Sequence, residues 1–120
     1  MRRAVLLAVV LVPAAGPVRA ADAEHGASLF EQCQACHTLT VENGVGPTLK
    51  GVIGRHAGAI AGFRYSPAMR RANVVWDAAT LDRFLADPQA VVRGNRMPFA
   101  GVTEAGDRQD IIAFLAKEGS

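Results

Sequence analysis

Three residues that could hold a prosthetic group lie together in the sequence Cys33-Gln34-Ala35-Cys36-His37. On a helix, side chains three or four residues apart share a face, so Cys33, Cys36 and His37 can address the same object. Two thiols can add to the two vinyl groups along one edge of a haem, and the neighbouring imidazole can reach its iron. The spacing therefore predicts one haem c attached through both cysteines, with His37 as an iron ligand.

Three other uses of this motif compete with haem attachment. A disulfide between Cys33 and Cys36 is possible in an exported protein, but it leaves His37 without a role. A zinc site would need two more ligands, and His25 and His56 lie far apart and unpaired in the sequence. A thioredoxin-like redox pair would need a β-α-β context, and we predict no strand before the motif. The sequence therefore favours haem over these alternatives.

A second axial ligand is expected from a methionine. Iron held by histidine alone is open to oxygen or peroxide, whereas a thioether on its other side closes the site and raises the reduction potential. Apart from Met1, the chain has Met69 and Met97. Met97 lies between two predicted helices, where Pro98 stiffens the backbone beside it. We predict that Met97 binds the iron and that Met69 fills space in the core.

The first twenty residues have the organisation of a secretory signal peptide. Arg2 and Arg3 form a positive region, residues 4–12 are apolar, and residues 18–20 offer a small-residue cleavage signal. This apolar run is too short to span a bilayer, which needs roughly 20 residues. We expect removal of residues 1–20 on export to the periplasm, with an uncleaved anchor as the alternative, and one domain over residues 21–120.

Removal of the signal peptide reverses the sign of the net charge. The loss of Arg2, Arg3 and Arg19 lowers the basic residues from 13 to 10, against 11 acidic residues, so the formal charge changes from +2 to −1. A nucleic-acid-binding domain needs a basic face. We therefore expect no binding to nucleic acid, and no membrane insertion after cleavage.

The pattern of the mature chain is helical throughout. Helix N-caps are expected at Asp22, Ser66, Asp77 and Thr103, and Pro88 should end the third of these helices. Between the first two lies a glycine-rich stretch, residues 43–62, and a loop of this length needs something to order it, such as a cofactor. The prediction is an all-α domain of three main helices, with short helices and long loops around one haem.

Separated segments of the mature chain together resemble a known family, the class I cytochromes c. They are Cys33 to His37, Gly46-Pro47, Gly54-Arg55, residues 63–66, Trp76, residues 84–88, residues 97–101 and residues 110–115.

The resemblance implies roles for individual residues. The Pro47 carbonyl would accept a hydrogen bond from the second ring nitrogen of His37. Arg55, Tyr65 and Trp76 would hydrogen-bond the haem propionates, whose buried charge would otherwise be costly.

The resemblance also implies that Gly26 lets Ile111 and Phe114 of the last helix approach closely. Two positions depart from the family pattern, because Phe84 replaces a common tyrosine and Met69 a common asparagine. We expect a drier distal side as a result.

The implied function is a periplasmic electron carrier and not an enzyme. It would be a monomer that makes small, transient contacts with redox proteins, taking electrons from a dehydrogenase or cytochrome complex and passing them to an oxidase or reductase. The family's lysine ring is thinned here to Lys50, Arg93 and Arg96. A peroxidase would need an open iron site and a distal histidine–arginine pair, which we do not find. A subunit dedicated to one dehydrogenase or oxidase is the other alternative.

Overall fold

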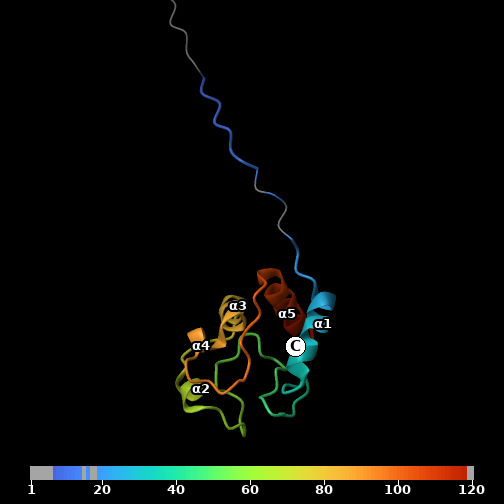
Figure 1. The fold of residues 1–120 in the computed structure, drawn as a ribbon, viewed down its shortest axis with the longest axis vertical. Coiled ribbons are helices and arrows are strands. Elements are labelled where there is room, and N and C mark those ends of the chain that lie inside the picture. Colours follow the sequence, from blue (N-terminus) through green and yellow to red (C-terminus); the bar gives the residue numbers. More distant parts are fainter. Residues whose placement is uncertain (1–6, 15, 17–18, 119–120) are drawn as a thin grey trace, which may run out of the picture.

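The computed structural model describes residues 7–14, 16 and 19–118 of the chain. The described residues contain five helices: α1 (Ala23–Gln34), α2 (Pro67–Arg71), α3 (Ala78–Ala86), α4 (Pro88–Val91) and α5 (Ala105–Glu118) (Figure 1). In this part of the chain, β pairing is limited to an isolated bridge between His56 and Val75. The predicted all-α fold with three main helices, short helices and long loops is confirmed.

Local sequence signals explain where most of these helices begin. The side chains of Asp22, Ser66 and Asp77 each accept a hydrogen bond from a backbone N–H in the first turn of α1, α2 and α3. The expected cap at Thr103 is wrong, because α5 begins only at Ala105. The Arg108 guanidinium donates to the Thr103 carbonyl at 2.9 Å, which holds Thr103 in the loop that precedes α5.

The break between α3 and α4 also follows from the sequence. Asp87 precedes Pro88 and has an extended backbone, with φ −155° and ψ 93°, because the proline ring excludes the helical conformation there. Pro88 then serves as the first residue of α4, and the Asp87 side chain accepts a hydrogen bond from the Ala90 N–H. The proline therefore ends one helix and begins another.

Helices α1 and α5 cross in direct contact at Gly26 (Figure 1). A Cβ atom at Gly26 would lie 1.9 Å from the Asp110 carbonyl oxygen and 3.0 Å from the Ile111 nitrogen. Further along the same contact, the rings of Phe30 and Phe114 pack with their centroids 5.2 Å apart. The close approach implied by the family resemblance is therefore present, and at Gly26 it is made by the backbone of α5.

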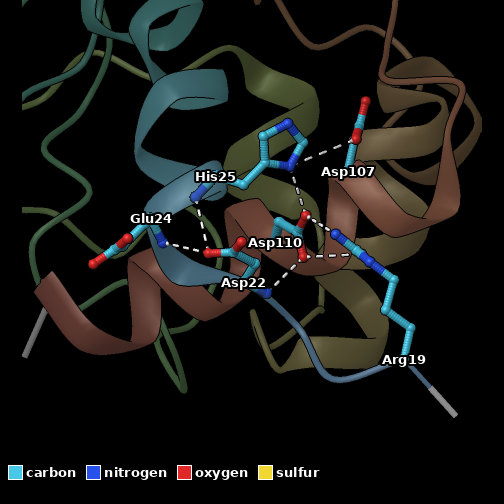
Figure 2. A network of polar contacts seen from close by, with 6 residues as sticks. All are labelled: Arg19, Asp22, Glu24, His25, Asp107 and Asp110. Atoms are coloured by element: carbon cyan, nitrogen blue, oxygen red, sulfur yellow. Dashed lines mark hydrogen bonds and ion pairs between the residues drawn. The ribbon is translucent and has the colours of Figure 1, made fainter.

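A polar network ties the start of α1 to α5 around the buried carboxylate of Asp110 (Figure 2). This carboxylate accepts hydrogen bonds from the Arg19 guanidinium at 2.8 and 3.2 Å, from the Asp22 N–H at 2.7 Å and from His25 Nδ1 at 2.7 Å. These donors, Arg19 first, hold the pKa of Asp110 well below its usual range. The hydrogen bond to Asp110 in turn raises the pKa of His25.

The apolar core lies where α1 and α3 each pack against α5. Phe30 and Ile111 are almost completely buried between α1 and α5, and Leu81 and Phe84 of α3 pack into the same cluster. Trp76, just before α3, packs on Phe84 with a ring-centroid distance of 4.8 Å. This core forms one wall of an internal cavity.

The expected signal peptide falls only partly within the described residues. Residues 1–6, 15, 17 and 18, which include Arg2 and Arg3, lie outside them. The apolar side chains of residues 7 and 9–12 are exposed to solvent. Within the described parts of the chain, no helix has the length and apolar character needed to cross a membrane. Cleavage after Ala20 and the division into residues 1–20 and 21–120 remain predictions.

Candidate functional site

The end of α1 brings the two thiols and the imidazole of the attachment motif together. Cys33 lies in the last turn of α1, and the N–H groups of Cys36 and His37 donate to its carbonyl at 3.1 and 2.9 Å. The motif is therefore folded as a helix end followed by a turn. Its three side chains all line the same cavity, as the spacing predicted.

The state of the two thiols bears on the alternatives to haem. Cys33 and Cys36 are free and half-buried, and burial raises the pKa of the Cys33 thiol. A redox-active pair normally has a thiol whose pKa is lowered. For zinc, the described residues hold one group of His, Cys, Asp or Glu side chains close enough for a metal ion. It consists of His25, Asp107 and Asp110 and includes neither cysteine.

His37 is fixed in orientation by its neighbours in the glycine-rich loop. Its Nδ1 donates to the Pro47 carbonyl at 2.7 Å, which is the contact implied by the family resemblance. Because Nδ1 carries the proton of the neutral ring, the lone pair of Nε2 is free to bind a metal. A Cβ atom on Gly46 would lie 2.6 Å from the ring, so only glycine allows this packing. Burial lowers the pKa of His37, and the neutral imidazole is the form that binds a metal.

The cavity has a volume of about 490 Å³. Residues from α1, the glycine-rich loop, α3, α5 and the loop after α4 line it. All eight site residues predicted from the sequence are among them: Cys33, Cys36, His37, Pro47, Arg55, Tyr65, Trp76 and Met97. Met69 and Phe84, the two departures from the family pattern, line it as well. The long loop over residues 43–62 is therefore wrapped around a cavity, where a cofactor was expected.

Part of the cavity wall carries hydrogen-bond donors that could bind an anion. The Arg55 guanidinium donates to the carbonyls of Lys50 at 3.1 Å and Thr48 at 2.7 Å. Its Nε is buried and has no hydrogen-bond partner, which is costly unless a ligand accepts from it. Tyr65, also buried, uses its hydroxyl oxygen to accept from the Ile60 N–H at 3.1 Å, so its own O–H is free to donate.

These features fit a haem. The cavity is large and mostly apolar, as a porphyrin requires, and two thiols and an oriented imidazole lie on its wall. The unpartnered Arg55 Nε matches the need of a propionate for a buried donor. No residue present conflicts with the group.

Sequence reasoning missed several residues at this site. Asn95 and Arg64 also line the cavity and were assigned no role, and Arg96, named only among the basic residues of the thinned lysine ring, lines it too. Asn95 is buried in the loop before Met97. A polar residue two positions from a candidate ligand is a weak signal in itself, because its burial depends on how the loop folds.

Comparisons with known proteins relate the chain to a family. The family model for cytochrome c matches residues 23–118. A cytochrome c2 from Rhodomicrobium vannielii is 43% identical over 115 residues, which cover 94% of this chain and 92% of that protein. A cytochrome c2 from Blastochloris viridis is 38% identical over 117 residues, covering 96% of this chain and 92% of that protein.

A solved structure of similar sequence has the same fold. The structure of cytochrome cH from Methylobacterium extorquens superposes with a TM-score of 0.77 at 43% sequence identity, covering 80% of this chain and 98% of that one. Membership of this family implies a covalently bound haem c and bears out the expectation that the chain is not an enzyme. The chain therefore belongs to the cytochrome c family of electron carriers.

Proposed function

We propose that the mature chain, residues 21–120, is a periplasmic one-electron carrier whose haem is bound through Cys33 and Cys36 and whose iron is ligated by His37 and Met97. The observation that carries this proposal is the convergence of both thiols, the oriented His37 ring and the Met97 side chain on one cavity. When bound, haem supplies an iron that alternates between the ferrous and ferric states. Held by both His37 and Met97, the iron would be closed to substrates.

The chain's own residues tune this cofactor. The Pro47 carbonyl holds the His37 ring and increases its basicity through the 2.7 Å hydrogen bond. Arg55, Tyr65 and Trp76 would bind the propionates, and the unpartnered Arg55 Nε supports this role. The Met97 thioether favours the ferrous state, because it is a soft ligand, and so raises the reduction potential.

Replacement of the methionines tests the ligand assignment. Met97→His should lower the potential while the iron stays six-coordinate and low-spin. Met97→Ala should open the site, giving a high-spin or water-ligated ferric haem, carbon monoxide binding and some peroxidase activity. Met69→Leu is the matched control, since Met69 lines the same cavity and should leave the spin state unchanged.

The readout is the weak sulfur-to-iron charge-transfer band of the ferric protein. If the band survives Met97→Ala and is lost in Met69→Leu, Met69 is the ligand. If the wild type lacks the band and binds carbon monoxide rapidly, the protein is an enzyme with an open site and not a carrier.

The redox partners are proposed to be transient, with a dehydrogenase or cytochrome complex as donor and an oxidase or reductase as acceptor. Arg64 and Arg96 line the cavity, and Arg96 is exposed, so these cations are available to an acidic partner surface. Electron transfer to candidate oxidases should slow as ionic strength rises. Stable co-purification with one partner complex from periplasmic extract would instead identify a dedicated subunit.

A further inference from the structure

The loop that carries Met97 is fastened to α4 by a single buried amide. Asn95 Nδ2 donates to the carbonyls of Pro88 at 3.1 Å and Val92 at 2.9 Å. Its Oδ1 accepts from the Met97 N–H at 3.0 Å. Both amide hydrogens and the amide oxygen are therefore used, and the side chain is 7% exposed. One side chain thus joins both ends of α4 to the backbone of the proposed ligand.

A second amide holds the same loop from outside. Gln89, an exposed residue of α4, accepts from the Gly94 N–H at 3.0 Å through Oε1 and donates to the Asn95 carbonyl at 3.0 Å through Nε2. Gly94 has a φ of +90°, which lets the chain turn back towards α4 at this point. We call Gln89 and Asn95 the amide lock.

Without the amide lock, few polar contacts would fix the approach to Met97. The backbone N–H of Asn95 donates to the Val92 carbonyl at 3.1 Å, which fixes the chain only as far as Asn95. The Arg96 guanidinium donates to the Arg64 carbonyl at 2.9 Å, but both residues are exposed. Pro98 has no N–H to donate, and the Met97 carbonyl accepts only the local bond from the Phe99 N–H at 2.9 Å. The Met97 N–H has its acceptor in Asn95, so loss of this amide would free the backbone of the proposed ligand.

We propose that Asn95, supported by Gln89, is a positioning residue for Met97: the amide lock keeps the thioether in the cavity and sets how often it leaves the iron. This inference rests on the proposed ligation by Met97. Loss of buried hydrogen bonds that exist only while the loop is closed favours the open loop by the free energy of those bonds. The iron should then become accessible to small ligands without any change in the haem attachment.

The experiment is the rate at which imidazole binds to the ferric holoprotein, together with the pH at which the sulfur-to-iron band disappears. Asn95→Ala should raise the binding rate by about tenfold or more, the equivalent of one buried hydrogen bond, and should lower the pH at which the band is lost. Asn95→Asp keeps an acceptor for the Met97 N–H but turns a carboxylate oxygen towards the Pro88 and Val92 carbonyls, so it should bind imidazole at least as fast as Asn95→Ala. Gln89→Ala should have a smaller effect in the same direction, and it keeps the test available if Asn95 variants do not fold.

Two control variants separate positioning from general stability. Asn73→Ala removes an exposed amide from another loop and should leave the rate unchanged. Gly26→Ala disturbs the distant contact between α1 and α5. If it accelerates imidazole binding as much as Asn95→Ala at equal loss of stability, the effect is global and the positioning role is wrong.

Failure of this inference can be told apart from failure of the ligand assignment. If the wild type shows the band, Met97→Ala removes it, and the Asn95 and Gln89 variants bind imidazole at the wild-type rate, only the amide lock is refuted. If the band is absent from the wild type, or survives Met97→Ala, the proposed ligation is refuted and the inference with it.

Discussion

Replacing Gly26 by alanine should destabilise the protein strongly, because the added methyl group has nowhere to go. An alanine Cβ would lie 1.9 Å from the Asp110 carbonyl oxygen and 2.5 Å from its carbon. Ordinary van der Waals contact begins at 3.4 Å, so α1 and α5 would have to separate by about 1.5 Å at this point. Both partners are helix backbone, which cannot move aside as a flexible side chain can.

The cost follows from the packing that this separation disrupts. A gap of about 0.5–1 Å already forfeits a quarter to a half of the dispersion energy between facing atoms. Overpacking costs about 1–3 kcal/mol, and a backbone shift places this case at the upper end. The better helix propensity of alanine returns about 1 kcal/mol. The net loss of about 2 kcal/mol should lower Tm by about 8–16 °C in a domain of this size.

Thermal unfolding of the holoprotein, followed by circular dichroism, measures this loss. Gly106→Ala is the matched control, because Gly106 also lies within a helix but its Cβ would meet only the end of the Arg19 side chain, with the nearest atom at 3.1 Å. That variant should be as stable as the wild type or up to about 1 kcal/mol more stable. If Gly26→Ala matches Gly106→Ala in Tm, the two helices do not approach as closely as described.

Three further predictions concern the cofactor, the leader and pH. Acid-acetone extraction should leave the colour with the protein, and Cys33→Ala should sharply reduce the holoprotein yield; haem passing freely into the solvent would contradict attachment. Mass spectrometry of the mature protein should find its N-terminus at Ala21 or within a residue or two, whereas an intact Met1 on the haem-loaded form would exclude a cleaved signal. The folded-state pKa of His25 is raised, mainly by its hydrogen bond to Asp110, so its contribution to stability is complete below the unfolded-state pKa of about 6.5 and is lost as the pH rises through the folded-state pKa. The Tm should therefore fall as the pH is raised from about 5 to 9, and His25→Gln should flatten this fall. His56→Gln, at an exposed position, is the control and should leave the fall unchanged. If the Tm of His25→Gln falls as steeply as that of the wild type, another group is responsible.

The spacing of residues within one helical turn was enough to locate the attachment motif. Cys33, Cys36 and His37 share a turn, so their convergence needs only local backbone geometry. The caps at Asp22, Ser66 and Asp77 act within three residues of each helix start, and they could be read from residue type alone.

Residues far from the motif could be assigned only through the family resemblance. Arg55, Tyr65 and Trp76 come from separate segments, and no periodicity relates them to Cys33. Their meeting around one cavity depends on the path of the glycine-rich loop. The Arg55 Nε without a partner, which supports a propionate site, is a property of the folded loop and has no sequence signal.

The amino-acid sequence by itself determined the main chemical features of this protein: two thiols and an imidazole at the spacing of haem attachment, a methionine that we propose as the second ligand, and helices most of which begin at polar caps. The tertiary structure alone decided which groups support that chemistry. Asp110 meets His25 across more than 80 residues of sequence, and Asn95 is buried against α4. The physical reason is that local geometry limits contacts only over a few residues, whereas the partner of a buried polar group depends on which helices pack together.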